Sequence, residues 1–166
     1  MKFHLVDRIE SVEPGARIVT TKALSLAEEY LADHFPAFPI LPGVMMLEAL
    51  VQSAAWLVRL EQDFSKSIVV LGSARNVKYA NMVQPGNTLR CEIDVMSIGQ
   101  EESKFKATGT IDGKTAVSAR LILRSFNLAD TKGAYLAQAD RDIVAQVRRT
   151  WDLVHGPRAL QTAAEA

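Results

Sequence analysis

The chain has 166 residues, 48% of them hydrophobic, and 19 lysines and arginines balance 19 aspartates and glutamates. This length suits one domain whose core is large enough to fold without cross-links, and the single cysteine allows neither an internal disulfide nor a zinc cluster. The balanced charge, with no basic stripe, argues against nucleic acid as a partner.

Two short extended segments are predicted at the start, over about residues 3–12 and 16–24. A turn at Pro14 and Gly15 separates them. A proline-rich loop over 33–43 follows. The first element of the chain is therefore expected to be a pair of strands that leads into a stiff loop.

The pattern over about residues 41–62 is helical, with Pro42 at a position where its missing N–H has no helical partner. The longest apolar run, 44–58, contains Glu48 and Gln52, and we expect it to be too short and too polar to span a bilayer. The first residues lack the apolar core of a signal peptide. We therefore expect a soluble, cytoplasmic protein with no membrane insertion.

Strand patterns fill the next part of the chain. Residues 67–79 are rich in β-branched side chains, and apolar residues then alternate with polar ones over 89–95, 105–111 and 117–123. Asp-Gly at 112–113 predicts a tight hairpin. Alternation indicates a sheet with one buried face, so the chain belongs to the α+β class.

The predicted central helix is apolar on nearly all sides, and such a helix must be covered all round. One twisted sheet covers only part of it. The simplest second cover is another copy of the chain, so we expect a homodimer.

The end of the chain follows a different pattern. An apolar stripe predicts a helix over about 133–154, and the residues after it are expected to fray. Packing on its own domain and binding of a partner are both open for this helix. We therefore divide the chain into a domain over residues 1–128 and a helical extension with a flexible tail over 129–166.

The helix and the loop before it carry the residues with the clearest chemistry. Glu48 and Gln52 are four residues apart and share a helix face. A carboxyl group among apolar neighbours suits a general acid, or else a structural role with a hydrogen bond to Gln52 or to backbone. His34 stands in a loop stiffened by prolines, where an imidazole suits a general base, or else a structural role.

The start of the helix adds a third group. Its first N–H groups, after Pro42, lack helical partners and carry partial positive charge. They suit a thioester carbonyl oxygen on which negative charge develops. A base, an acid and an oxyanion site within residues 34–52 favour proton abstraction next to a carbonyl with acid-assisted loss of a leaving group.

The stretch HFPAFPILPGVMMLEALVQ, residues 34–52, resembles the active-site segment of the 3-hydroxyacyl-acyl carrier protein dehydratases of the FabZ type. The spacing from histidine to glutamate is the same as in that family. Similar stretches are HLVDRIESVEPGARI near the start, VKYANMVQPGNTL at 77–89 and GTIDGKTAVSA at 109–119, so the resemblance covers about residues 3–125. The positions that match in the first stretch are His34, Phe35, Pro36, Pro39, Pro42, Gly43, Val44, Glu48, Ala49 and Gln52.

The resemblance implies a hotdog fold, in which an antiparallel sheet wraps around a long central helix; the C-terminal helix is extra. It implies a homodimer, which in many members assembles into a trimer of dimers, with active sites in tunnels at the dimer interface. It also implies an acyl carrier protein with a phosphopantetheine thioester as partner, and neither a metal nor a redox cofactor.

The reaction implied is reversible dehydration of a (3R)-3-hydroxyacyl thioester to a trans-2-enoyl thioester, in fatty acid biosynthesis or a related acyl pathway. His34 would remove the α-proton, and Glu48 of the other protomer would assist loss of the 3-hydroxyl as water. The backbone at Gly43 and Val44 would polarise the carbonyl, and Gln52 would support the acid. The implied substrate-binding positions are Phe35, Pro36, Gly43, Val44 and Gln52.

Two positions depart from the family pattern: Ala37 replaces a usual glycine, and Phe38 stands where polar residues are common. Alanine would be strained if this position needed a positive φ.

Two other interpretations of the function stay open. A hotdog thioesterase would use the helix carboxylate for hydrolysis, and a subunit whose site is disabled would bind the carrier without turnover.

Overall fold

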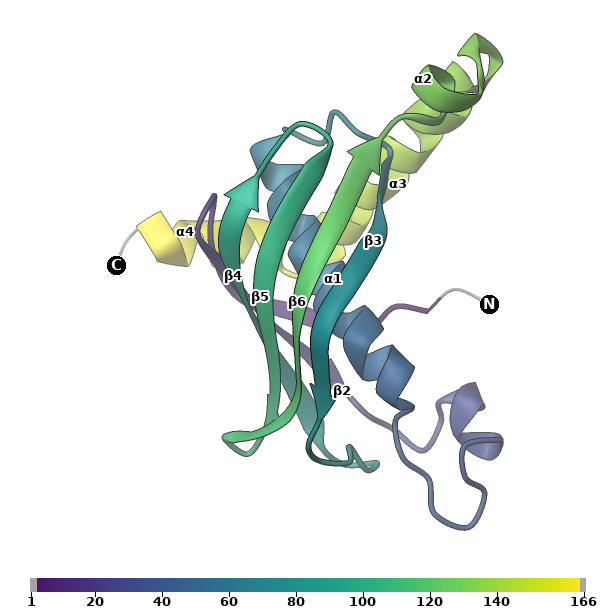
Figure 1. Cartoon of the computed structure of the whole chain (residues 1–166), viewed down its shortest axis with the longest axis vertical. Helices are drawn as coiled ribbons and strands as arrows, with labels where there is room; N and C mark the ends of the chain where they lie inside the picture. Colours follow the sequence, from purple (N-terminus) through teal and green to yellow (C-terminus); the bar gives the residue numbers. More distant parts are fainter. Residues whose placement is uncertain (1–2, 165–166) are drawn as a thin grey trace.

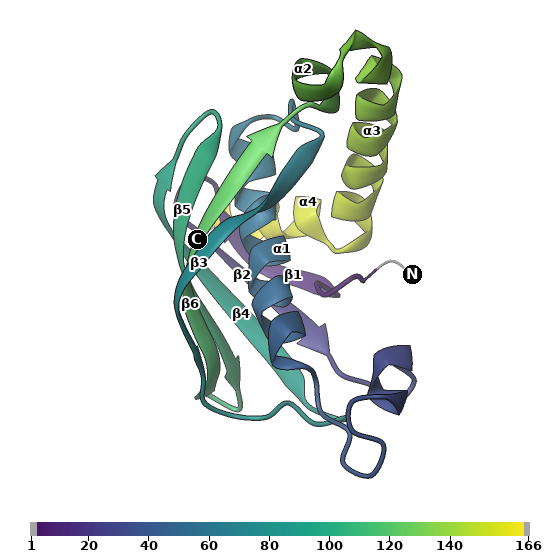
Figure 2. The ribbon, with the colours of Figure 1, turned by 45° about the vertical axis from the view of Figure 1, so that its right-hand side comes forward.

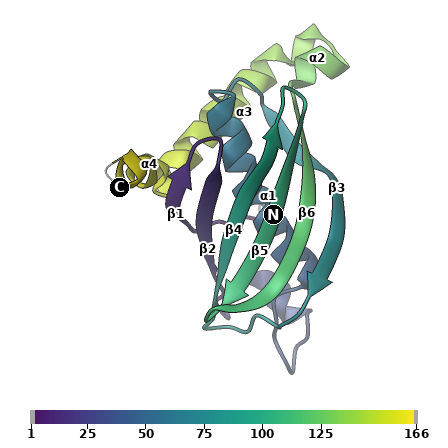
Figure 3. The same cartoon turned by 60° about the vertical axis from the view of Figure 1, so that its left-hand side comes forward.

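The computed structural model describes residues 3–164, and it places one curved antiparallel sheet around a long helix (Figure 1). The strand order across the sheet is β1-β2-β4-β5-β6-β3, which Figure 3 shows from the outer face. Both predicted N-terminal strands and the later strands are present. The strands are β1 Arg8–Glu13, β2 Arg17–Ala23, β3 Ile68–Tyr79, β4 Thr88–Ile98, β5 Glu102–Ile111 and β6 Lys114–Phe126.

The helices divide into a central one and a C-terminal group. Figure 2 shows α1 inside the curve of the sheet and α3 on the side of α1 that faces away from the sheet. The α+β hotdog arrangement that the sequence predicts is confirmed. The helices are α1 Gly43–Glu61, α2 Leu128–Lys132, α3 Ala137–Leu153 and α4 Gly156–Ala164, with short 3-10 turns at Glu29–Ala32 and Ala134–Leu136.

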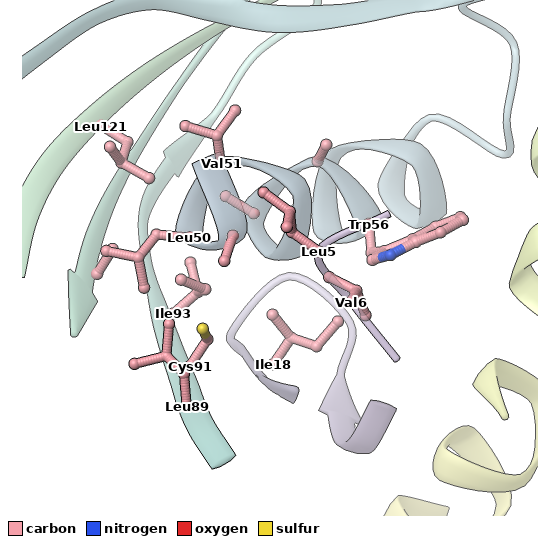
Figure 4. Close-up of a cluster of buried hydrophobic side chains, with 14 of the residues drawn as sticks. Leu5, Val6, Ile18, Leu50, Val51, Trp56, Leu89, Cys91, Ile93 and Leu121 are labelled. Atoms are coloured by element: carbon pink, nitrogen blue, oxygen red, sulfur yellow. The ribbon is translucent and has the colours of Figure 1, made fainter. Parts of the chain in front are cut away.

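The buried face of the sheet follows the predicted alternation. On β4, Leu89, Cys91 and Ile93 are fully buried, and Phe105 on β5 lies opposite Leu121 on β6. Figure 4 shows the β4 side chains beside Leu50 of α1. Side chains between these point outward, because successive residues of a strand face opposite sides.

The hairpin between β5 and β6 turns at Asp112 and Gly113, which have φ values of +48° and +76°. Positive φ at both central residues is the geometry of a type I′ turn, whose twist matches that of the flanking strands. Asp-Gly is a sequence that tolerates this conformation, so the predicted hairpin forms where the sequence places it.

The core lies between the sheet and α1. A polar contact fixes the helix within it: Ser53 Oγ donates to the carbonyl of Ala49 (2.7 Å) and lies 2.7 Å from Thr20 Oγ1 of β2. Buried hydroxyl groups need such partners. This contact therefore holds α1 in register with the sheet.

By length and composition alone, α1 is apolar enough to cross a membrane, in contrast to the expectation from its polar residues. More than half of its apolar window, 56%, is buried inside the protein, however. The central helix of a soluble domain has the same composition, because its apolar sides contact the core. We therefore assign its apolar character to packing within the fold.

The C-terminal extension forms more helix than the sequence predicts. The helix expected over 133–154 is α3, and residues 156–164, expected to fray, form α4. The N–H of Ile9 donates to the carbonyl of Val154 just before α4 (2.8 Å), and α4 itself packs against β1 with Ala159 buried. The sequence pattern does not reveal this support, because the partner strand β1 is far away in the chain.

Asp140, at the start of α3, ties the extension to the rest of the fold. Its carboxylate accepts hydrogen bonds from the hydroxyl of Ser67 and from the N–H groups of Leu128 and Ala129 (both 2.9 Å). Burial alone would raise the pKa of Asp140. The three hydrogen bonds outweigh burial and hold this pKa below its ordinary value of 3.8.

A carboxyl group with a lowered pKa stabilises the fold above its ordinary pKa, and this contribution is lost as the pH falls through the folded-state value. We expect the urea midpoint of the wild type to exceed that of Asp140→Asn at neutral pH. The difference should shrink as the pH falls below 3.8. A difference that stays constant over that range would contradict this role for Asp140.

The two edges of the sheet differ. On the β1 side, α4 lies against the strand (Figure 3). On the other side, β3 pairs only with β6 among the described strands. The β3 edge therefore leaves backbone N–H and C=O groups available for another strand.

Candidate active site

Glu48 lies on the side of α1 that faces away from the sheet, where it lines a groove of about 520 Å³. The groove runs between α1, the first residues, β3 and α3. Glu48 and Gln52 are both partly buried on this wall. The shared helix face predicted from their spacing is thus present.

The amide of Gln52 has a fixed orientation. Its Oε1 accepts the N–H of Leu5 (3.0 Å), and its Nε2 donates to the carbonyl of Phe3 (3.1 Å). Nε2 also donates to Oε1 of Glu48 (3.0 Å). Because the two backbone contacts settle which end of the amide is the donor, Gln52 presents an N–H to Glu48 and holds one carboxyl oxygen. The second oxygen, Oε2, is then the one suited to a substrate hydroxyl.

His34 lies in the loop between the first 3-10 turn and α1. This loop is at the end of the molecule where α1 begins (Figure 2). Its Nδ1 is 3.3 Å from the carbonyl oxygen of Ile40. A carbonyl can only accept, so Nδ1 carries the proton in this contact and Nε2 remains the basic nitrogen. The Ile40 N–H in turn donates to the His34 carbonyl (3.4 Å), which closes the loop on itself.

The start of α1 has the free donors that the sequence predicts. The first hydrogen bonds run from the N–H groups of Met45 and Met46 to the Pro42 carbonyl, and no side chain among the described residues caps this end. The N–H groups of Gly43 and Val44 precede these bonds. They therefore point outward with the partial positive charge of a helix start.

Tyr79, at the end of β3, is a residue that sequence reasoning missed. A Cβ on Gly43 would lie 3.2 Å from Cε1 of its ring. The ring is half exposed and lies beside the free N–H groups. Only the fold brings it there, because the two residues are far apart in the sequence.

Within one chain, the predicted acid and base are not brought into one pocket. His34 is absent from the lining of the Glu48 groove, whereas His4 is part of it. His4 is exposed to solvent. The position of His4 makes it a necessary control for any role given to His34.

The other predicted substrate positions lie near His34 and are open to solvent. Phe35 is 54% exposed, Val44 is 71% exposed and Pro36 is exposed. Ala37 has no positive φ, so alanine in place of glycine adds no backbone strain in this conformation. Phe38 is 48% exposed beside it. A single chain thus leaves this apolar loop uncovered.

The far part of the groove holds Arg59. Its guanidinium lies 5.4 Å from the centre of the Trp56 ring, a cation–π distance. Its Nε is buried without a hydrogen-bond partner among the described residues. Burial lowers the pKa of Arg59 to about 10, so it stays charged at neutral pH.

Cys91 is fully buried under α1, and burial raises the pKa of its thiol to about 12. A thiol is nucleophilic as the thiolate, which such a pKa suppresses. Cys91 is therefore a core residue, as its place on the apolar face of a strand predicts.

The family comparison places these residues in a known context. Residues 1–124 match the model of the FabA-like domain, which covers all of the predicted site and the sheet except the last two residues of β6. The extension from α2 onwards lies outside the match.

Curated relatives agree with this match. The chain is 35% identical over 117 residues to the 3-hydroxyacyl-[acyl-carrier-protein] dehydratase FabZ of Clostridium acetobutylicum, which covers 70% of this chain and 83% of the relative. It is 37% identical over 121 residues to FabZ of Ruminiclostridium cellulolyticum, covering 72% and 84%. It is 34% identical over 133 residues to FabZ of a Janthinobacterium species, covering 78% and 85%.

Solved structures share the fold at low identity. The dehydratase heterocomplex ApeI:P of Xenorhabdus doucetiae superposes with a TM-score of 0.61 at 17% identity, covering 75% of this chain and 84% of that one. A mutant thioesterase of Pseudomonas aeruginosa gives 0.56 at 13% identity, covering 72% and 80%. The fold is therefore common to dehydratases and thioesterases, and the sequence relatives decide between them: this chain belongs to the FabA-like family, among its FabZ-type hotdog dehydratases.

Proposed function

We propose that this protein catalyses the reversible dehydration of (3R)-3-hydroxyacyl-acyl carrier protein thioesters to trans-2-enoyl thioesters in fatty acid biosynthesis or a related acyl pathway. The observation that carries the proposal is the Glu48–Gln52 pair. Gln52 is oriented by backbone and donates to Oε1 of Glu48, a residue that lines a mostly apolar groove. A positioned acid in such a groove suits protonation of a leaving hydroxyl.

In the proposed mechanism, Nε2 of His34 removes the proton from C2 of the substrate, and negative charge moves onto the thioester oxygen. The N–H groups of Gly43 and Val44 stabilise that charge. Glu48 gives its proton to the 3-hydroxyl, which leaves as water while the C2–C3 double bond forms. Phe35 and Pro36 would enclose the acyl chain beside His34.

The site is completed by a second copy of the chain in this proposal. His34 lies outside the Glu48 groove, the loop around Phe35 is exposed, and the β3 edge is unpaired. Two chains that meet along β3 would cover the exposed face of α1 and bring the loop of one to the groove of the other. A homodimer, further assembled as a trimer of dimers, is the state we propose.

A row of cations suggests where the acyl carrier protein binds. Lys106, Arg120 and Arg75 lie directly opposite one another on β5, β6 and β3, all exposed. Asp94 lies opposite Lys106 on β4 but pairs with Arg17 (3.7 Å). Like charges side by side destabilise a sheet, so we assign the row to an acidic partner rather than to the fold.

The place of this row fits delivery of a tethered substrate. Arg75 and Tyr79 belong to the same strand, and Tyr79 lies against Gly43 at the start of α1. A carrier bound at the row would therefore stand near the proposed oxyanion site. Arg59 lies in the groove and is not part of this row.

Reversal of both charges in Arg75→Glu/Arg120→Glu should lower kcat/KM for carrier-bound substrate by about tenfold or more, because attraction raises association rates by at least that factor. The same variant should keep its kcat/KM for a pantetheine thioester, which has no carrier. Arg141→Glu/Arg149→Glu on α3 makes the same change in net charge and is the control. Equal losses in both variants would contradict the assignment.

The experiment that tests the function follows the ultraviolet absorbance of the conjugated enoyl thioester with purified protein and a 3-hydroxyacyl carrier thioester. Enoyl product that forms with wild type and fails to form with Glu48→Gln would support dehydration. The shared fold makes a thioesterase the second candidate. Release of free thiol without enoyl product would favour it, and carrier binding without either product would favour a non-catalytic subunit.

We also propose that residues 1–128 form the dehydratase domain and residues 129–166 a helical extension. The end of the family match at residue 124 supports this division. We propose further that the protein is soluble and acts in the cytoplasm. The burial of α1 within the fold and the FabZ relatives support this.

A further inference from the structure

The extension, which the family match does not include, forms one wall of the groove that holds Glu48. Figure 2 shows α3 beside α1 with the sheet on the far side. Four residues of α3 line the groove, facing α1 and β3. They are Ile143, Gln146, Val147 and Thr150.

This helix is fixed at both ends. At its start, Asp140 accepts hydrogen bonds from Ser67 and from the first residues of α2. Near its end, the ring of Trp151 lies 5.5 Å from that of Trp56 and 6.2 Å from that of Phe64. The Val154 carbonyl then binds β1 through Ile9. The part of α3 between these contacts is therefore held in place along the groove.

The groove has the chemistry of a site for an acyl chain. One end holds Glu48 and Gln52, and the walls beyond them are mostly apolar, with Val51 and Ala55 on α1 and Val69 on β3. The free energy of a long apolar chain falls when it leaves water and binds to such a surface. Because the groove begins at the proposed acid Glu48, an acyl chain whose thioester reacts there could extend into the groove.

The length of the groove is set by α1. Arg59 lies eleven residues beyond Glu48, which at a rise of about 1.5 Å per residue is about 16 Å. Its guanidinium is charged and has no acidic partner among the described residues. Contact with the terminal methyl group of an acyl chain would remove water from this charge and is therefore unfavourable. The apolar part of the groove therefore ends near Arg59.

We propose that α3 is the roof of the acyl-chain groove and that Val147 and Ile143 set the longest chain the enzyme accepts. The proposal rests on the dehydratase function above and adds a specificity role for the extension. Both side chains are partly buried, so each leaves surface toward the groove. Because α3 runs opposite to α1, with Trp151 beside Trp56 and Asp140 bonded to Ser67, Val147 and Ile143 lie toward the end of the groove that is remote from Glu48.

The test varies side-chain size at Val147 and measures kcat/KM for carrier thioesters of short, medium and long acyl chains. Val147→Trp should fill the groove and lower kcat/KM for long chains by tenfold or more while short chains keep their wild-type value. Val147→Ala should move the profile toward longer chains. Arg149→Trp adds the same bulk on an exposed position of α3 that does not line the groove, and it is the matched control.

Two outcomes would overturn the proposal. One is a chain-length profile that stays the same in Val147→Trp, Val147→Ala and Arg149→Trp. The other is an equal loss for short and long chains in Val147→Trp with a native circular dichroism spectrum, which would place Val147 in the reaction site rather than in a chain groove.

A binding measurement separates this proposal from the proposed function. Trp56 lines the groove and Trp151 packs against it, so tryptophan fluorescence should change when a non-reactive long-chain acyl pantetheine thioether binds to wild type. Val147→Trp adds a tryptophan of its own, so its binding is measured by calorimetry, where the affinity should fall at least tenfold. If wild type binds the thioether in this way but has no dehydratase activity on any chain, the proposed function is wrong and the proposed role of α3 is supported. If the protein is active and Val147→Trp binds the long-chain thioether as tightly as wild type does, the proposed role of α3 is wrong and the proposed function is supported.

Discussion

A mixture of His34→Ala chains with Glu48→Ala chains is expected to regain about a quarter of the wild-type activity, because a two-fold dimer shares each site between its chains. Each variant alone should lose about 10²- to 10⁴-fold in kcat, the contribution of a positioned acid or base. The chains are mixed in equal amounts by unfolding and refolding together, and enoyl absorbance measures turnover.

The gain follows from how the sites are built. Random association makes half of the dimers mixed, and each mixed dimer has one site with both substitutions and one site with neither. If His34 and Glu48 of the same chain acted together, no dimer would contain an intact site. Activity of the mixture that stays at the level of the single variants would therefore disprove the shared site.

His4→Ala is the control for the choice of histidine. His4 lines the groove of Glu48 in the same chain, whereas His34 does not. Near wild-type activity of His4→Ala and loss in His34→Ala would identify the base. The opposite result would move the base to His4 and place the whole site within one chain.

Trp151→Ala is expected to lower the free energy of unfolding by about 3–5 kcal/mol, the usual cost of removing a large buried aromatic side chain. Trp151 is 7% exposed and contacts the rings of Trp56 and Phe64. It also lies against Gly156, where a Cβ would be only 2.1 Å from Cδ2 of the ring. One side chain thus joins α1, α3 and the start of α4.

Urea denaturation followed by circular dichroism measures this effect. Leu153→Ala, two residues along α3 and 77% exposed, is the control and should change stability by at most about 0.5 kcal/mol. A loss in Trp151→Ala no larger than in Leu153→Ala would mean that the extension adds little to the stability of the domain.

The sheet and the central helix could be predicted because their patterns are local. Alternation from Leu89 to Val95 fixes which face is buried, and Asp112-Gly113 fixes the hairpin. The pairing of Glu48 with Gln52 follows from helical spacing, and the structure contains that contact. These features depend on residues that are neighbours in sequence, so one chain is enough to read them.

The rest depends on contacts between distant residues. The contact of α4 with β1, the ring of Tyr79 against Gly43 and the α3 wall of the groove leave no periodic signal in sequence. The orientation of the Gln52 amide also comes from distant backbone, at Phe3 and Leu5. Sequence could therefore propose the acid and its helper but not the walls of the space in front of them.

The unequal edges of the sheet limit how the chain can assemble. The β1 edge is blocked by the C-terminal helix α4, while the β3 edge is open. In the homodimer proposed above, two chains join along β3, so both open edges are used up and only the β1 edges remain at the two ends of the joined sheet. Growth by strand addition then stops after one step, so the extension protects the protein from forming fibres through its sheet.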